Sequence, residues 1–241
     1  MKSSICAAFL LAACSLQAAV PSVNEIIDRA RATVGTESAL KELVTLEIKG
    51  MIRPTDPKVP EVSIVIIARK PSSQRLEVRM DNLVESTILD GDQACIVRSN
   101  LEQDATQMRM LSEKELERVQ FNTQQFFSFY EPDFKNGEKV EYAGIEQRRG
   151  VRCHKLVYTH PKGMKLTRFF AVNDDSLIST MTDMGVESVE IGEQIINGIK
   201  FPESIEYYDN QKMIHTIEIA SIKVNSPLPA GIFEIPKAKS E

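Results

Sequence analysis

The sequence predicts a mainly β protein of the α+β class, built on one strongly curved antiparallel sheet. From Leu46 onward, apolar and polar residues alternate with a period of two, which is typical of half-buried strands. Turn sequences such as Asn197-Gly198 separate the alternating runs, as in β-hairpins. There are about eleven such runs, more than a flat open sheet comfortably holds, so we expect the sheet to curl into an incomplete β-barrel.

Two helices are expected before the first strand. Ser22 followed by Glu25 forms a capping-box pattern, and apolar residues then recur at helical spacing. Gly35 ends this helix, in the position where glycine commonly adopts a left-handed conformation. A second, short helix is expected over residues 37–43, with Thr36 as its cap.

The strands fall into two groups, on either side of a helical segment that begins at Ser112. Glu115 completes a second capping-box pattern there, and Pro132 ends the segment. Four of the ten Phe residues of the chain lie within residues 121–129, which makes this segment the most aromatic part of the sequence.

The first 18 residues have the pattern of an export signal. Lys2 precedes an apolar run over residues 5–13, which suits a signal peptide and is far too short to span a membrane. Cleavage after Ala18 would release a soluble protein, whereas a lipobox pattern that ends at Cys14 would leave a lipoprotein tethered to a membrane. Both interpretations place the mature chain outside the cytoplasm, and residues 19–241 are expected to form a single domain.

Two cysteines remain after such processing, Cys95 and Cys153. In an oxidising compartment they can form a disulfide, which would stabilise the fold by about 4 kcal/mol on the chain-entropy model. The alternative is that each is a separate buried thiol. The chain has no Cys-x-x-Cys pair, so neither a redox pair nor a zinc site is indicated.

Charge and motifs argue against several classes of function. The chain has a formal net charge of −5, or −6 once Lys2 is lost with the leader, and no basic stripe that would attract nucleic acid. His154, His160 and His215 show no metal-ligand spacing, and neither a nucleophile elbow nor a phosphate-binding loop occurs. We therefore expect no catalytic residue, no metal, no cofactor and no nucleic-acid partner.

The order of several short motifs gives a family resemblance. In the first half, a basic pair precedes a proline in Ala68-Arg69-Lys70-Pro71, and an Asp-Gly turn follows after a strand, in Ile88-Leu89-Asp90-Gly91-Asp92-Gln93. The second half contains, in this order, Gly150-Val151-Arg152-Cys153-His154-Lys155-Leu156, Phe170-Ala171-Val172-Asn173-Asp174-Asp175, Asn197-Gly198-Ile199-Lys200-Phe201-Pro202 and the closing segment 227–236. Together they resemble the periplasmic lipoprotein-carrier (LolA-like) superfamily and its related outer-membrane lipoprotein-sorting proteins, over nearly the whole mature chain.

The resemblance implies an incompletely closed antiparallel barrel whose helices pack on the concave face as a lid over an apolar cavity. It also implies a non-enzymatic, periplasmic protein that binds lipid acyl chains in lipoprotein sorting, with an inner- or outer-membrane protein as partner. The family's carrier has an arginine directly before the proline, where its side chain ties a strand to the lid. This chain has Lys70 there and Arg69 one residue earlier, and alternation predicts that these two candidate lid contacts point to opposite faces.

A lining for acyl chains must be continuous and apolar, because each CH₂ group removed from water contributes about 0.8 kcal/mol. The apolar strand over residues 61–70 and its neighbour supply the expected wall, and the aromatic segment supplies the expected lid. For each residue the alternative is an ordinary core position, and for the whole protein it is a regulatory or scaffolding role that binds a protein partner. The candidate ligand-binding residues are Ile64, Ile66, Leu76, Val78, Phe121, Phe126, Phe127, Phe129 and Tyr130.

Overall fold

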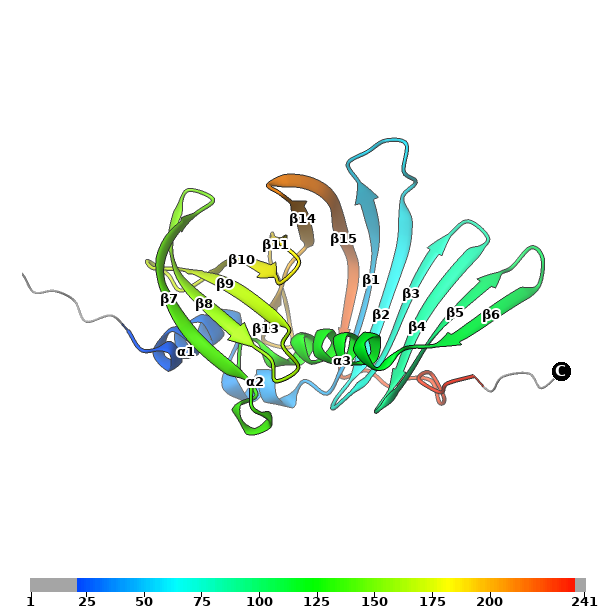
Figure 1. Ribbon diagram of the computed structural model, residues 1–241, viewed down its shortest axis with the longest axis horizontal. Coiled ribbons are helices and arrows are strands. Elements are labelled where there is room, and N and C mark those ends of the chain that lie inside the picture. Colours follow the sequence, from blue (N-terminus) through cyan, green and yellow to red (C-terminus); the bar gives the residue numbers. More distant parts are fainter. Residues whose placement is uncertain (1–20, 237–241) are drawn as a thin grey trace, which may run out of the picture.

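The computed structural model describes residues 21–236, and Figure 1 shows their arrangement. The expected leader, residues 1–18 with Cys14, lies outside the described residues. The helices of the described part are α1 Val23–Val34, α2 Glu37–Glu42, α3 Glu113–Ser128 and the 3-10 helix η1 Phe134–Asn136. Its strands are β1 Thr45–Pro54, β2 Val62–Arg69, β3 Ser73–Met80, β4 Leu83–Asp90, β5 Gln93–Asn100, β6 Ala105–Met110, β7 Lys139–Arg148, β8 Val151–Thr159, β9 Lys165–Ala171, β10 Leu177–Thr182, β11 Val186–Ile191, β12 Gln194–Ile196, β13 Ile199–Phe201, β14 Ser204–Asp209 and β15 Lys212–Val224.

Thirteen of the described strands form one antiparallel sheet, in the order β6-β5-β4-β3-β2-β1-β15-β14-β11-β10-β9-β8-β7. Most neighbours in the sheet are also neighbours in sequence, and the exception that joins the two halves is the pairing of β1 with β15. The sheet curves strongly but does not close, so that β6 and β7 are its two edges (Figure 1). The predicted mainly β fold with an open, curved antiparallel sheet is confirmed.

The described part has more strands than the sequence predicts. The alternation did not reveal β6, because this edge strand is exposed on both faces apart from the half-buried Met108. β12 and β13 form a separate hairpin, whose turn is the predicted Asn197-Gly198 with φ angles of 50° and 77°. Positive φ at both central residues is what a tight hairpin turn requires.

The helix starts agree with the sequence. α1 and α3 each begin with a complete capping box, and Thr36 caps α2. Gly35 ends α1 for a different reason from the one expected, because its φ of 175° is ordinary extended backbone. A Cβ at this position would lie 2.8 Å from the carbonyl oxygen of Gly198, so the glycine permits close approach of α1 to the β12–β13 turn.

The helices pack on one face of the sheet, which we call the inner face; the opposite face is the outer face. Thr123 of α3 donates a buried hydrogen bond from Oγ1 to Oε1 of Gln74 on β3, at 2.9 Å. Across the neighbouring strands, Ala68 and Leu89 lie directly opposite Gln74 and share its face. Because side chains alternate along a strand, every second residue from these positions also belongs to the inner face. Figure 1 shows α3 crossing the base of the curved sheet on this concave side.

Two buried clusters attach the helices to the inner face. The first contains residues of α1, β8 and β9 together with Phe121 of α3. The second contains residues of α2, β1, β2, β13 and β15 together with Phe127 of α3. Large aromatic side chains contribute much of the buried apolar area of a core, so these two residues anchor α3 to both clusters.

The cysteines do not form the disulfide that the sequence left open. Cys95 on β5 and Cys153 on β8 are both buried and both free. Nine strands lie between β5 and β8 in the sheet, and both cysteines face its outer side. Burial raises the pKa of both thiols, as expected for inert core cysteines.

Candidate functional site

The four predicted wall residues lie together on the inner face. Ile64 pairs with Val78, and Ile66 pairs with Leu76, across β2 and β3. Ile64 is 5% exposed, while the other three are half-buried. Strand alternation therefore brings the set together as predicted, although whether it binds a ligand stays a prediction.

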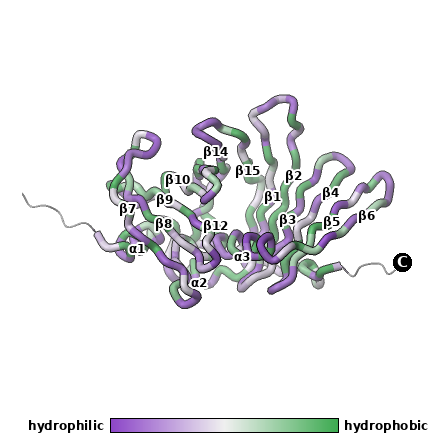
Figure 2. Tube along the Cα trace, in the orientation of Figure 1, coloured by the Kyte–Doolittle hydropathy of each residue, from purple (hydrophilic) through white to green (hydrophobic). Residues whose placement is uncertain are grey.

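The same apolar surface continues on the strands beyond β2. In the register, Ile48 and Ile52 of β1 belong to the inner face, followed by Ile217 of β15 and Ile205 of β14. All four are half-buried. Figure 2 shows hydrophobic residues along β1, β2 and β15. We call this set the apolar wall; it consists of Ile48, Ile52, Ile64, Ile66, Leu76, Val78, Ile205 and Ile217.

A groove of 540 Å³ opens on the inner face at the ends of β2–β6 that lie away from α3. Its apolar lining includes Val62, Val78, Met80 and Leu83. Val78 belongs to the apolar wall as well, so the groove and the wall are continuous. The volume is within the range of about 300–1,000 Å³ that is usual for small-molecule sites.

The predicted lid residues divide into two groups. Phe121 and Phe127 are 4% and 9% exposed, and their rings are occupied by core contacts. Phe126, Phe129 and Tyr130 are only half-buried. The first two therefore anchor α3, while the other three pack against the same clusters and stay partly exposed.

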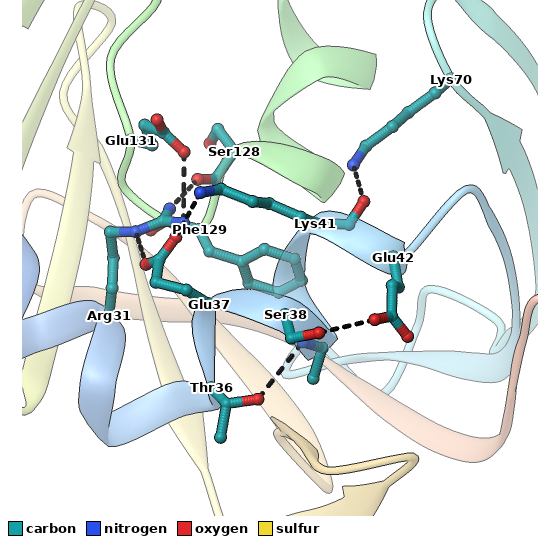
Figure 3. Close-up of polar contacts among 11 residues, drawn as sticks. Arg31, Thr36, Glu37, Ser38, Lys41, Glu42, Lys70, Ser128, Phe129 and Glu131 are labelled. Atoms are coloured by element: carbon teal, nitrogen blue, oxygen red, sulfur yellow. Dashed lines mark hydrogen bonds and ion pairs between the residues drawn. The ribbon is translucent and has the colours of Figure 1, made fainter.

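Arg31 of α1 fastens the end of α3 (Figure 3). Its side chain is 4% exposed, and Nη1 donates hydrogen bonds to the carbonyl oxygens of Ser128 and Phe129, at 2.7 and 2.9 Å. The last carbonyls of a helix have no partner within the helix, so Arg31 supplies one. Glu37 of α2 accepts from Nε and Nη2 at 2.8 and 3.0 Å, and Glu131 lies 3.2 Å from Nη2. One guanidinium thus joins α1, α2 and the end of α3.

Arg31 is not among the residues predicted from the sequence, although a signal for it exists. Arg31 follows Ile27 by four residues and so falls on the buried side of α1, where an arginine needs several partners. Its hydrogen bonds lower the pKa of the Glu37 carboxyl.

Lys70 and Arg69 point to opposite faces of the sheet, as alternation predicts. Lys70 Nζ donates a hydrogen bond to the carbonyl oxygen of Lys41 on α2 at 3.4 Å (Figure 3). It also lies 5.6 Å from the centre of the Phe127 ring. Burial lowers the pKa of Lys70. Arg69 lies over the ring of Phe233, 4.8 Å from its centre, in the segment that follows β15. Of the two candidate lid contacts, Lys70 alone reaches the helices in the described part.

Polar contacts tie α3 to both arms of the sheet. Gln120 Nε2 donates to the carbonyl oxygen of Gly91 at 2.9 Å, beside the Thr123–Gln74 bond to β3. On the other side, Arg168 of β9 donates from Nη2 to Gln125 Oε1 at 2.7 Å. Each such bond contributes only about 0.5–1.5 kcal/mol, so α3 is held by several weak contacts besides its two aromatic anchors.

The described part shows no cluster of side chains that could hold a metal ion. Among residues 21–236, no group of three or more His, Cys, Asp or Glu side chains gathers where it could hold a metal ion. His154 contacts Tyr142, His160 packs on Phe121, and His215 stacks on Tyr207, so the three histidines lie apart. None of the helices in this part of the chain is long and apolar enough to cross a membrane.

The fold and the site together define a class of protein: an open, curved antiparallel sheet with helices on its concave face and an apolar inner wall. No family model matches the chain, and no curated protein matches its sequence. Solved structures do match its fold, and one of them is a LolA superfamily protein.

Three of these structures span nearly the whole described chain. A DUF1329 family protein from Desulfovibrio piger is 12% identical, with 88% of this chain and 97% of that chain covered and a TM-score of 0.57. A LolA superfamily protein from Nitrosomonas europaea is 12% identical, with coverage of 90% and 99% and a TM-score of 0.56. A putative outer membrane lipoprotein-sorting protein domain from Vibrio parahaemolyticus is 8% identical, with coverage of 87% and 95% and a TM-score of 0.55. At these identities the likeness concerns the fold.

Proposed function

We propose that the protein is a non-enzymatic, exported binder of lipid acyl chains that acts in lipoprotein sorting or trafficking in the bacterial cell envelope. The observation that supports this proposal is the apolar wall, a continuous set of apolar side chains on the inner face, all half-buried except the buried Ile64. The names of the similar structures, a LolA superfamily protein and a lipoprotein-sorting domain, point to the same kind of work.

The apolar wall suits an acyl chain energetically. Transfer of about eight CH₂ groups from water to such a surface contributes about 6 kcal/mol, from which the entropic cost of association is subtracted. A polar ligand would gain little from the apolar wall itself, because the wall residues offer no hydrogen-bonding side chain. The wall therefore favours an aliphatic ligand.

The mechanism we propose is that α3 moves to admit the chain. Phe126, Phe129 and Tyr130 are half-buried and would contact the ligand, while Arg31 and Lys70 hold the helices over the sheet. A membrane protein partner would trigger release by drawing α3 away from the wall.

Native mass spectrometry of the protein purified from its own envelope tests the proposal. We expect a co-purifying mass of acyl-chain size, which the double variant Ile66→Thr/Leu76→Thr loses. The variant Val65→Thr is the matched control, because Val65 is equally half-buried on β2 but faces outward. A wild-type protein that carries no lipid, even after incubation with one, contradicts the proposal.

A protein partner is the second candidate function. Apolar side chains are exposed around the groove, with Met80, Leu83 and Leu101 being 36%, 48% and 56% exposed. The neighbouring edge strand β6 also has unpaired backbone groups, which suit strand addition by another chain. Recovery of a stoichiometric protein partner together with a lipid-free mass would favour a regulatory or scaffolding role.

A further inference from the structure

One row of the inner face ends in a carboxylate. Across β1, β15 and β14 the row consists of Ile52, Ile217 and Ile205, directly opposite one another. The next residue in the row is Glu190 of β11, which pairs with Ile205. An apolar path along the inner face therefore leads to one acidic side chain.

The adjacent row, two residues along each strand, is polar. From β15 to β9 it consists of His215, Tyr207, Ser188, Thr180 and Arg168. The rings of Tyr207 and His215 are stacked, with centroids 4.6 Å apart and an angle of 18° between the planes. We call Glu190, Tyr207, His215 and Arg168 the polar arc.

Glu190 is reached by water but surrounded by protein. Its side chain is exposed, yet burial raises the pKa of its carboxyl, and the charge of Arg168 offsets only part of this effect. A group that lines a concave surface has these two properties together, because solvent enters from one side only. Within residues 21–236, the side-chain carboxyl of Glu190 accepts no hydrogen bond and has no basic nitrogen within 4.0 Å. The carboxylate thus makes no direct ion pair in this part of the chain, although the charge of Arg168 acts on it, and a cationic ligand can supply such a pair.

Arg168 is a buried arginine that forms no ion pair with any carboxylate of the described residues. It is 5% exposed, and its guanidinium lies over the rings of Tyr158 and Tyr130, at 4.5 and 5.3 Å from their centres. Nη2 bonds Gln125, while Nη1 finds no hydrogen-bond partner in the described part of the chain. Buried arginines normally satisfy their donors, so this one points to an incompletely satisfied polar region.

We propose that the polar arc receives the headgroup of an acyl-chain cargo, and that this headgroup carries an ammonium group for which Glu190 is the counter-ion. The inference rests on the proposed function, since the apolar wall would hold the chain. Arg168 is too deeply buried to meet a ligand anion, whereas Glu190 is accessible, so the charge offered to a ligand is negative. The aromatic rings of Tyr207 and Tyr130 beside it favour a cation further.

The proposal implies that ammonium binding depends on pH through Glu190. Burial and the charge of Glu190 raise the pKa of Tyr130 and Tyr207, and burial lowers the pKa of His215, so these groups are neutral around pH 7. The affinity for a permanent cation should therefore rise with pH as Glu190 ionises, above its ordinary pKa range.

Binding of two twelve-carbon probes to the full-length mature protein tests this inference. Dodecyltrimethylammonium carries a charge at every pH, and dodecanol carries none; both are titrated calorimetrically below their aggregation limits. At pH 8 we expect the wild-type protein to bind dodecyltrimethylammonium about tenfold more tightly than dodecanol, a difference in binding free energy of about 1.4 kcal/mol. The preference should fall as the pH is lowered to 5.

The variant Glu190→Gln keeps the shape of the side chain and should abolish both the preference and its pH dependence, with dodecanol binding unchanged. Glu141→Gln is the matched control. It removes the same charge, but Glu141 is exposed on the outer face of β7. Equal binding of the two probes by the wild-type protein, or a preference that survives in Glu190→Gln, overturns the headgroup site while the acyl-chain proposal stands. If neither dodecanol nor the cation binds to the wild-type protein, both the headgroup site and the acyl-chain proposal are overturned.

Discussion

Arg31 and Arg168 are almost equally buried, with 4% and 5% of each residue exposed, but their surroundings differ. Arg31 has two carbonyl oxygens and two carboxylates within reach of its guanidinium. Arg168 has one amide oxygen and two aromatic rings. The partners of Arg31 complete a structural junction between helices, whereas Arg168 keeps an unused hydrogen-bond donor beside the inner face.

Replacement of Arg31 by alanine should destabilise the protein by about 2–4 kcal/mol, because two helix-terminal carbonyls lose their buried partner. Urea denaturation measures the loss. Amide hydrogen exchange should also accelerate in the last turn of α3 before it changes in β8 or β9. Arg29→Ala on the same helix is the control: its ion pair with Asp175 is 48% exposed on the arginine side, and it should cost less than about 1 kcal/mol. Equal effects of the two variants would contradict the role given to Arg31.

Residues whose orientation follows from local alternation could be predicted from the sequence, whereas residues whose role depends on long-range packing could not. The opposite orientation of Arg69 and Lys70, and the shared face of Ile66 and Leu76, follow from the two-residue period of a strand. The role of Arg31 depends on carbonyls almost a hundred residues away in sequence, which no local pattern contains.

At the scale of the element, α3 is a helix whose two ends are fixed differently. Arg31 fastens its C-terminal end, and the ion pair between Arg109 and Glu115 joins its first turn to β6. The aromatic segment was predicted as one lid surface, but its side chains point to different sides of the helix. Phe127 enters a core and its neighbour Phe126 remains half-buried, and the sequence alone does not say which side of the helix faces the sheet.

The capping box of α3 predicts a pH dependence of stability. Hydrogen bonds from Arg109, and then from Ser112, lower the pKa of Glu115 to about 2 from an ordinary value of 4.5. A carboxyl whose pKa is depressed by folding contributes stability above 4.5 that is lost as the pH falls towards 2. Glu115→Gln should therefore be less stable than wild type at pH 7, with the difference in unfolding free energy shrinking by pH 3. Glu113→Gln, in the same turn without these bonds, should show a smaller loss, and a pH-independent difference for Glu115→Gln would count against this assignment.

At the scale of the whole molecule, one continuous sheet places distant residues on one concave surface. The apolar wall joins β2 and β3 of the first half to β14 and β15 at the end of the chain, through the pairing of β1 with β15. Glu190, Tyr207, His215 and Arg168 come from four different strands. The curved open fold could be predicted from strand number and alternation, but the polar arc could not, because it depends on the strand order and on the register of each pair.

The most direct test of the account is to find where an acyl chain lies on the sheet. A twelve-carbon fatty acid with a photoreactive diazirine at its end is bound to the mature protein, crosslinked by light, and located by peptide fragmentation. We predict labels on inner-face residues of the β2–β3 hairpin, such as Ile66, Leu76 and Val78, with the outward-facing Val65 unlabelled. Labels on the outer face alone, or none at saturating probe concentrations, would contradict the claim that the inner face binds acyl chains.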